Sequence, residues 1–548
     1  MTGTPAVPAA ATGSGGRRNA GHGRPHPWAA LDRPGVAIAL IALALVLTAG
    51  LTGLLEPTEA RYAEIAREMR SSGDYLVPRL DGIPHYHKPP LTYWILAASY
   101  AILGESEWGA RLPTALATVA VLALSVVALR RRFGALTPAG PATWMLGTSA
   151  LFFALGRSVA SDPYLAAAVA GFWALAPSPW ALGALGIGFL VKGPVVLVPT
   201  VLVVLVAAAW ARDRSMLGML GPAWGWALFA AIGLPWFLIV AARTPGLLSY
   251  LVNTQVWQRY TTEVDRRPGP PWYFVGVLLG GALPWTPAFL AGFIQLWRER
   301  AAPPARLALC WLLVPLIFFS FSGSKLPAYL LPCFVPVGWM AALGLERGGG
   351  VTRAVTAGLL AGFALTGLIV GSFAFGRLVG LEPPRAGMLP WAAIVGLVAL
   401  GYAATWVARS RPSVAALLVL FGLVSLLTAA VPYEGRLGSA RPLARALRES
   451  RTPGEPVVEY LRFNAGLPFY LRELVPMLEV QRESGFLDPA REASVFVTRD
   501  SIAAWAASHP RVWILGPRGA SERLGRSLGL RYQRVAREQR EALGFVAR

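Results

Sequence analysis

Long apolar stretches recur along this chain of 548 residues and restrict its fold more than any other feature. A helix needs about 20 apolar residues to cross the hydrocarbon core of a bilayer. The chain is 55% hydrophobic, with a mean hydropathy of +0.50, which excludes an ordinary soluble protein. We predict a polytopic α-helical membrane protein with about 13 transmembrane helices, at about 36–55, 113–129, 141–156, 163–176, 180–191, 194–211, 223–241, 272–296, 306–322, 327–345, 353–375, 388–408 and 412–432.

The arginines indicate how the chain is oriented. The formal charge of +21 could suggest nucleic-acid binding, but the arginines lie in loops between apolar segments, where membrane orientation and lipid headgroups explain them better. If the N-terminal tail is cytoplasmic, all the short basic clusters are cytoplasmic too, as the positive-inside tendency requires. These clusters contain Arg130, Arg131, Arg132, Arg212, Arg214, Arg298, Arg300, Arg347, Arg353, Arg409 and Arg411.

The chain divides into three parts. Residues 1–34 are rich in Gly, Ala, Pro and Arg and predict a disordered cytoplasmic tail. Residues 35–432 form the membrane domain, which carries one large external loop at 56–112. After residue 432, charged sequence with mixed helix and strand signals predicts a soluble α/β domain over 433–548, on the periplasmic side.

The loop 56–112 contains two predicted helices. Its first part, "PTEARYAEIAREMRSSGDYLVP", has the pattern of an amphipathic helix that ends at Gly73. The stretch 91–103 has only about 13 residues, too few for a straight crossing, so we predict an interfacial or re-entrant helix. The segments 163–176 and 180–191 are also short and contain glycines, which predicts partial or tilted helices facing a cavity.

Lysine is rare, and each lysine has the same kind of neighbour. Of 50 basic residues only three are lysine, and a proline follows each within two positions: "HKPPL", "LVKGP" and "SKLPAY". The orientation above places Lys88, Lys192 and Lys325 on the external side. An ammonium group binds phosphate as a point charge, and beside a bilayer the available phosphate is that of a lipid. The alternative is chance in a chain whose composition favours arginine.

Carboxylates and aromatic residues accompany the lysines on the external side. Glu56, Glu59, Arg61 and Tyr62 lie in the first loop, and Asp162 lies between the third and fourth predicted spans. A carboxylate there could act as a general base for a hydroxyl acceptor. The alternative is that these residues only form structural ion pairs or extend their charged ends to the membrane surface.

Two histidines in "PHYHKPPLTYW", His85 and His87, could suggest zinc, but two histidines without further ligands nearby do not predict a metal site. We expect them instead to contact phosphate when protonated. Both cysteines, Cys310 and Cys333, lie in apolar segments, which argues against a disulfide framework or a thiolate metal site.

Several motifs together resemble a known family. The stretches "EPTEARYAEIAREM", "GDYLVPRL", "HKPPLTYW", "SDPYL", "LVKGP", "SKLPAYLLP" and "LPFYLRELV" are similar to those of the lipid A 4-amino-4-deoxy-L-arabinose transferases, which are GT-C glycosyltransferases related to the protein O-mannosyltransferases. The resemblance implies transfer of a sugar from a polyprenyl-phosphate donor to an acceptor on the external membrane face. It implies no nucleotide sugar, no cofactor and no essential metal.

The resemblance also assigns roles to individual residues. It implies that Lys88 and Arg259 lie around the donor phosphate, that Tyr62 and Tyr329 line the donor site, and that Arg61 holds the first loop. Lys192 and Lys325 match motif positions of less defined role.

The sequence departs from this family at two positions. Members usually have an Asp–Glu pair where this chain has Thr58 and Glu59, so the base could be Glu59, Asp162 or Glu56. The position before Lys88 is often acidic in the arabinose transferases and is His87 here. This second departure leaves the sugar and the acceptor open.

We interpret the chain as a GT-C-type glycosyltransferase of the bacterial inner membrane. It would use an undecaprenyl-phosphate-linked sugar to glycosylate lipid A, a glycan or a protein, with a carboxylate accepting the acceptor proton while cations stabilise the departing phosphate. The alternative is a transporter or flippase of lipid-linked saccharides. The large external loop with carboxylates, the external domain and the lack of a visible internal repeat favour the enzyme.

Overall fold

The structure, a computed structural model, describes residues 27–134, 136–262, 269–378, 391–481, 495–538 and 541–547, without the side chains of Arg259 and of residues 370–378. The predicted disorder of residues 1–26 lies outside the described residues. The end of the predicted tail is ordered, contrary to expectation, because Ala29–Asp32 forms a 3-10 turn. Asp32 accepts a hydrogen bond from Ser413 at 2.6 Å, and Trp28 packs edge-on against Trp406. These contacts tie the start of the chain to the last membrane helices.

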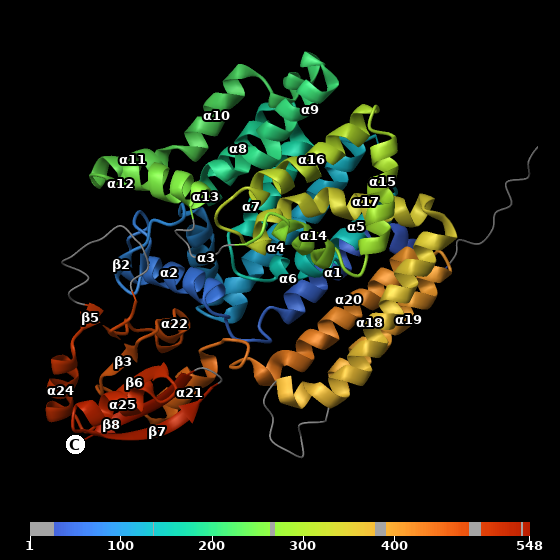
Figure 1. Cartoon of the computed structure of the whole chain (residues 1–548). Coiled ribbons are helices and arrows are strands. Elements are labelled where there is room, and N and C mark those ends of the chain that lie inside the picture. The colour runs from blue at the N-terminus through green and yellow to red at the C-terminus, as the bar shows by residue number, and fades with distance from the viewer. Residues whose placement is uncertain are drawn as a thin grey trace, which may run out of the picture.

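The membrane domain is a bundle of helices, with the C-terminal domain below it in Figure 1. Among the described residues, seven helices are long and apolar enough to cross a membrane, or up to nine if two bent pairs are each one span. The polytopic helical fold is confirmed, and the count of thirteen crossings stays a prediction. The bundle contains α1 (Pro34–Thr48), α4 (Glu107–Arg132), α5 (Ala139–Gly147), α6 (Ala150–Gly156), α7 (Asp162–Leu175), α8 (Pro179–Lys192), α9 (Val203–Ala211), α10 (Ala223–Gly233), α11 (Pro235–Arg243), α14 (Tyr273–Gly281), α15 (Thr286–Arg298), α16 (Pro303–Ser320), α17 (Phe334–Arg347), α18 (Gly349–Leu378), α19 (Trp391–Ala408) and α20 (Pro412–Ala430).

The chain reverses at Gly193, between α8 and α9. Helical residues continue without a gap from Pro179 to Ala211, but Gly193 has a φ of 74°, which side-chain-bearing residues rarely adopt. A Cβ built on Gly188 would lie 2.6 Å from Val196. Residues eight apart in a straight helix are separated by about 12 Å along the axis. The segments 180–191 and 194–211 are therefore two arms of a hairpin, and Lys192 lies at its turn.

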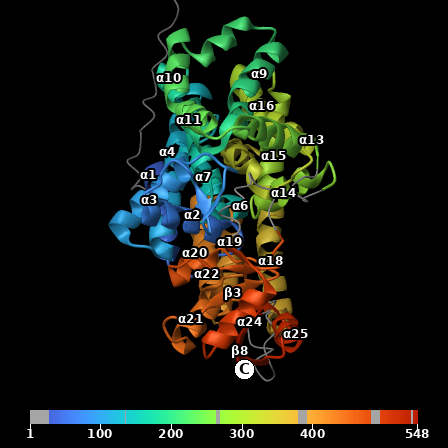
Figure 2. The same cartoon turned by 90° about the vertical axis from the view of Figure 1, so that its left-hand side faces the viewer.

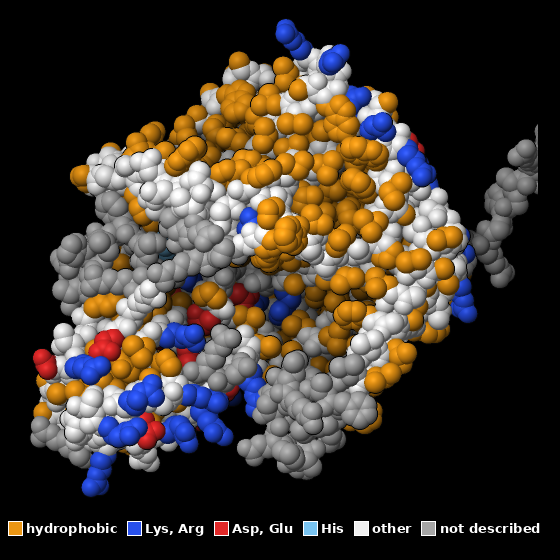
Figure 3. Space-filling view, in the orientation of Figure 1, with side chains coloured by type: hydrophobic (Ala, Val, Ile, Leu, Met, Phe, Trp, Pro, Cys, Tyr) orange, Lys and Arg blue, Asp and Glu red, His pale blue; other side chains and the backbone are white. Residues whose placement is uncertain are grey.

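The basic clusters gather at one end of the bundle. Arg347 pairs with Glu299 at 3.3 Å, and its guanidinium also donates to the Leu136 carbonyl, close after the 130–132 cluster. The rings of Trp210 and Trp297, which precede two further clusters, lie 6.1 Å apart. Lys and Arg side chains follow the edge of the apolar surface on the side away from the C-terminal domain (Figure 3). This grouping matches the one that the positive-inside argument requires.

The first loop, residues 56–112, folds into a small unit of helices at the opposite end. It contains α2 (Thr58–Ser72), the short hairpin of β1 (Arg79–Leu80) and β2 (Ile83–Pro84), and α3 (Leu91–Leu103). Gly73 ends α2 with a φ of 70°, as predicted. The segment 91–103 forms one helix as predicted, bounded by Pro90 and Gly104, and its interfacial or re-entrant placement stays a prediction.

The C-terminal domain is an α/β sheet domain, as predicted. Its six strands have the order β5-β4-β3-β6-β8-β7, in which the first four are parallel and the last two antiparallel. The parallel part is made of β3 (Val457–Tyr460), β4 (Met477–Leu478), β5 (Phe496–Val497) and β6 (Val512–Pro517), and the hairpin of β7 (Arg531–Arg537) and β8 (Glu541–Ala547) extends it. The helices of the domain are α21 (Arg441–Ser450), α22 (Gly466–Leu471), α24 (Arg499–Ser508) and α25 (Ala520–Ser527).

The first loop and the C-terminal domain share one hydrophobic core. Ala60, Ile65 and Tyr100 of the loop pack in the same buried cluster as Ala465 and Phe469. Figure 2 shows α2 and α22 facing each other between the bundle and the sheet. Polar contacts cross the same interface, since the backbone of Gly53 donates to Glu434, and that of Val475 to Asp81. The domain is therefore docked onto the loop by packing and by hydrogen bonds.

Candidate active site

The first turn of α2 is fixed by a buried ion pair. The guanidinium of Arg111, in α4, donates to both carboxylate oxygens of Glu59, at 3.0 and 2.6 Å. The same guanidinium donates to the carbonyls of Ala49, Thr52 and Gly53. Glu59 and Arg111 are both almost completely buried. One arginine thus joins the end of α1, the entry to α2 and the start of α4.

Glu59 has little capacity left for proton transfer. Its carboxylate also accepts hydrogen bonds from the backbone of Leu55 and Val159. Burial acts to raise the pKa of Glu59, but the charge of Arg111 and these hydrogen bonds outweigh it and hold that pKa below its usual range. The geometry therefore favours Glu59 as a positioning residue. Sequence reasoning missed Arg111, whose signal was a charged residue at the start of an apolar span.

A second ion pair lies at the N-terminal end of α7. Asp162 and Lys192 are 2.5 Å apart and nearly buried, and they join the start of α7 to the last residue of α8. The Tyr62 hydroxyl of α2 donates to Ser161 at 3.0 Å, and the Lys192 ammonium lies 5.0 Å from the centre of the Tyr329 ring. Four residues proposed from the sequence thus come together from four separate segments: Tyr62, Asp162, Lys192 and Tyr329.

Cations and histidines surround the stretch before α3. The rings of His85 and His87 are 4.2 Å apart. His85 is buried, and burial together with the charges of His87, Arg61 and Lys88 lowers its pKa well below the ordinary value. His85 is therefore neutral at pH 7, so the expectation of a protonated, phosphate-binding histidine remains open for His87 alone. Arg61 connects this group to the previous one because it neighbours Tyr62 on α2.

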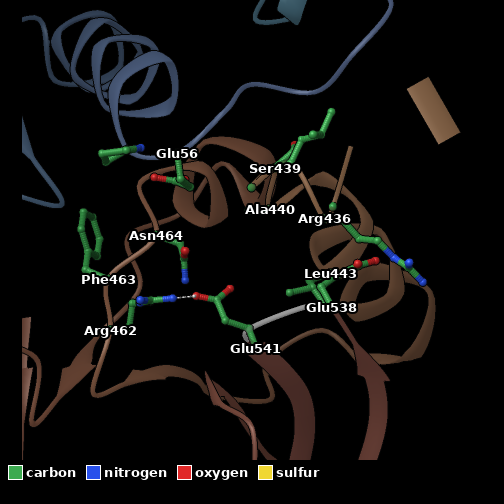
Figure 4. A pocket seen from close by; sticks show the side chains of 14 residues that line it. Glu56, Arg436, Ser439, Ala440, Leu443, Arg462, Phe463, Asn464, Glu538 and Glu541 are labelled. Carbon is green, nitrogen blue, oxygen red and sulfur yellow. Dashed lines mark ion pairs between the residues drawn. The ribbon is translucent and has the colours of Figure 1, made fainter. Parts of the chain in front are cut away.

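Glu56 belongs to a different place, the interface with the C-terminal domain. It lines a pocket of about 410 Å³ together with Arg462, Asn464, Glu538 and Glu541 (Figure 4). Its carboxylate accepts a hydrogen bond from the backbone of Gly466 at 2.6 Å. Burial raises the pKa of Glu56 to about 7. A carboxyl group of that pKa can accept a proton, but the structure does not bring Glu56 into contact with Asp162 or Lys192.

Lys325 and Arg259 complete the set of candidates. The Lys325 ammonium is buried and donates to the carbonyls of Ser320 and Ser322, at 3.1 and 2.6 Å. Its aliphatic stem packs beside Gly269. Arg259 begins the short helix α13 (Arg259–Thr261), and its side chain lies outside the described part of the structure.

The assembled site combines cations, one carboxylate and aromatic walls at the end of the bundle that carries the first loop. Arg61, Lys88 and Lys192 supply charge suited to a phosphate, Asp162 supplies a proton acceptor, and the rings of Tyr62 and Tyr329 form apolar surfaces. Within the described ranges, no group of three or more His, Cys, Asp or Glu side chains could hold a metal ion. Fold and site define an integral membrane protein of the GT-C glycosyltransferase class.

Comparisons with known proteins identify the family within this class. Residues 87–241 match the family model described as dolichyl-phosphate-mannose-protein mannosyltransferase. The undecaprenyl phosphate-alpha-4-amino-4-deoxy-L-arabinose arabinosyl transferases of Yersinia enterocolitica and Serratia proteamaculans are 33% and 31% identical to it. Each alignment covers 64% of this chain, and 68% and 65% of the respective relative. The chain belongs to this arabinosyl transferase family.

The fold agrees with that of a solved member. The crystal structure of ArnT from Cupriavidus metallidurans bound to undecaprenyl phosphate superimposes with a TM-score of 0.78 and 26% sequence identity. The superposition covers 93% of this chain and 97% of that chain. The resemblance first visible in short motifs therefore extends over bundle, loop and C-terminal domain.

Proposed function

We propose that this protein transfers a sugar from an undecaprenyl-phosphate-linked donor to an acceptor at the periplasmic face of the bacterial inner membrane. The observation that carries this proposal is the nearly buried Asp162–Lys192 pair beside Tyr62 and Tyr329, with Arg61 and Lys88 close by. The solved relative that matches the fold was crystallised with undecaprenyl phosphate. Cations suited to one lipid phosphate and a neighbouring carboxylate fit a direct displacement at the anomeric carbon.

In this reaction the acceptor hydroxyl attacks the anomeric carbon while its proton passes to Asp162. The bond between the anomeric carbon and the phosphate oxygen breaks, and undecaprenyl phosphate leaves with the bonding electrons. Lys88, Lys192 and Arg61 stabilise the charge that develops on the departing phosphate. Because Lys192 already pairs with Asp162, a phosphate that draws the ammonium toward itself leaves the carboxylate free to accept the proton.

The first donor to test carries 4-amino-4-deoxy-L-arabinose, since that sugar appears in the names of the relatives. The first acceptor to test is lipid A, and other envelope glycans or proteins come next. The histidine at position 87, where the arabinose transferases often have an acidic residue, gives a reason to compare several sugars rather than one.

The test uses the full-length protein in lipid nanodiscs with a purified polyprenyl-phosphate sugar and lipid A, in the presence of a chelator. We expect release of free polyprenyl phosphate and a mass increase of the acceptor. Product formation that requires a nucleotide sugar and proceeds without any lipid donor would overturn the proposal. Mass spectrometry of lipid A and surface glycans from cells lacking the gene would then identify the natural product.

A further inference from the structure

A second pocket lies between the first loop and the C-terminal domain, at the turn that joins α3 to α4. It has a volume of about 280 Å³. One wall is the turn itself, and the opposite wall is the arginine-bearing face of α21. The lining residues are Glu105, Ser106, Glu107, Arg441, Ala444, Arg445, Arg448, Phe469, Tyr470 and Arg472. No residue of the proposed catalytic group is among them.

The arginines of α21 form one stripe. Arg441, Arg445 and Arg448 follow the spacing i, i+4, i+7, which places them on the same side of the helix. Leu443 and Leu447 are buried against the sheet on the other side. The helix is therefore held in place by its apolar face, and the packing does not account for three arginines on the face that lines the pocket.

The pocket contains more positive than negative charge. Arg441 forms ion pairs with Glu107 and Glu434, and Arg472 lies 3.7 Å from Glu105. Arg70 also lies 3.3 Å from Glu105. The two lining glutamates are thus already neutralised by arginines.

Two arginines in the pocket have no carboxylate partner among the described residues. Arg448 donates to the Tyr470 carbonyl and forms no ion pair within the described part of the chain. Arg445 is exposed and forms no ion pair with the described residues. The side chains of Arg445 and Arg448 are therefore available for an anion.

Exposed apolar residues come directly before and after the turn at residues 105–107, which lines the pocket. Ile102 and Leu103 come directly before it and are 82% and 43% exposed. Trp108 and Leu116 follow it on α4 and are 40% and 58% exposed. They are eight residues apart, which places them on the same face of this candidate membrane span. Tryptophan at the end of a span is typical of the membrane–water boundary. The pocket therefore opens at the depth where lipid headgroups lie.

We propose that this pocket binds the phosphate headgroup of an anionic membrane lipid. The phosphate lies between Arg445 and Arg448, and the acyl chains run along Ile102, Leu103, Trp108 and Leu116. Arginine suits this task because its planar group donates two hydrogen bonds to one phosphate. The site requires only that the chain lies in a bilayer, and it does not depend on the proposed transfer reaction. A lipid bound here bridges the loop and the C-terminal domain.

The test measures lipid binding by full-length protein purified in detergent, without donor or acceptor, by native mass spectrometry. We expect phosphatidylglycerol to bind at least tenfold more tightly than phosphatidylcholine. Arg445→Glu should abolish most of this preference, because it replaces an uncompensated cation by an anion. The matched control is Arg526→Glu, an exposed arginine on α25 of the same domain, which should leave binding unchanged.

Three results would overturn the proposal. One is equal binding of the two lipids, and another is unchanged phosphatidylglycerol binding by a well-folded Arg445→Glu protein. The third is displacement of the lipid by millimolar glycerol phosphate, which would show a site for a soluble phosphate instead. Thermal unfolding without lipid shows whether Arg445→Glu has a folding defect. If it does, Arg445→Gln replaces it, and this variant should show a smaller loss of phosphatidylglycerol preference. None of these results depends on turnover, so they leave the proposed function untouched.

Discussion

At the scale of single residues, three lysines with the same proline-linked sequence context have three different environments. Lys192 forms an ion pair with Asp162, Lys88 lies among histidines and Arg61, and Lys325 donates to backbone carbonyls. Two of the environments lie around Tyr62 and its neighbour Arg61. In the third, the hydrogen bonds from Lys325 to the Ser320 and Ser322 carbonyls close the loop that precedes the segment containing Tyr329. Lys325 therefore stabilises this loop, in addition to any role at the site.

We predict that Asp162→Asn lowers turnover by about 10²- to 10⁴-fold, the usual contribution of a general base, with little change in the KM for the donor. The measurement is the initial rate of polyprenyl phosphate release by protein in nanodiscs. Glu299→Gln, at the opposite end of the bundle, is the matched control and should behave like the unaltered protein. Full turnover by folded Asp162→Asn protein would rule out Asp162 as the base.

Lys88→Ala should insert and fold normally but lose about 30- to 1000-fold in rate, corresponding to about 2–4 kcal/mol of transition-state stabilisation. Pro89 and Pro90 fix the direction of the chain behind Lys88, so its ammonium is held at one depth. Lys88→Arg should recover only part of the rate, because a guanidinium prefers a different pose on phosphate. Unimpaired Lys88→Ala turnover in the same assay would remove Lys88 from the site.

The sequence could identify most residues of the site but not their pairing. The lysine contexts, the carboxylates and the tyrosines were visible as residue types near span ends, and one lysine, one carboxylate and two tyrosines do meet. Asp162 and Lys192, however, are brought together only by the hairpin of α7 and α8, and Glu59 meets Arg111 across 52 positions. Side-chain contacts of this kind depend on the helix packing, which a single sequence does not encode in any local pattern.

At the scale of secondary structure elements, several breaks in the chain were predictable from a proline or a glycine. Pro90 and Gly104 bound α3, Gly73 ends α2, and Gly193 reverses the chain after α8. The segment 272–296 was predicted as one span, and the 112° bend between α14 and α15 was missed although Gly280, Gly281 and Pro284 lie at it. There the hydrophobic pattern continues through the break, so periodicity carries no signal for it.

The anchoring of α2 gives a stability prediction. Arg111→Ala leaves the Glu59 carboxylate buried without its partner and should cost about 3–5 kcal/mol of folding free energy. Thermal unfolding in detergent should show a clear fall in Tm and in yield. The matched control, Arg347→Ala, breaks the exposed pair with Glu299 and should cost less than about 1 kcal/mol. Equal effects of the two substitutions would contradict an anchoring role.

The lowered pKa of Glu59 also fixes the pH range of this contribution. A carboxylate with a lowered pKa stabilises the folded state fully above the pKa of the unfolded chain, about 4.3 for glutamate. The contribution is lost as the pH falls below that value and through the lower pKa of the folded state. The difference in Tm between the original protein and Arg111→Ala should accordingly be complete at pH 7 and shrink in strong acid.

At the scale of the whole molecule, the predicted orientation is open to a direct measurement. A single cysteine at Asp500, exposed on α24, should react with a membrane-impermeant thiol reagent in intact spheroplasts, whereas one at Ala20 should react only after lysis. The native Cys310 and Cys333 are buried and add little background. Labelling in the reverse pattern would refute a cytoplasmic N-terminus and a periplasmic C-terminal domain.

The shared core of the first loop and the C-terminal domain has a consequence for biogenesis. The loop leaves the ribosome early, while its partners Ala465 and Phe469 follow about 355 residues later. At the usual rate of synthesis this delay is roughly 20 to 70 s. Until then α2, with Arg61 and Tyr62, lacks part of the apolar surface that buries it. A nascent chain that stops before residue 465 should therefore leave α2 incompletely packed, however many of its helices have entered the membrane.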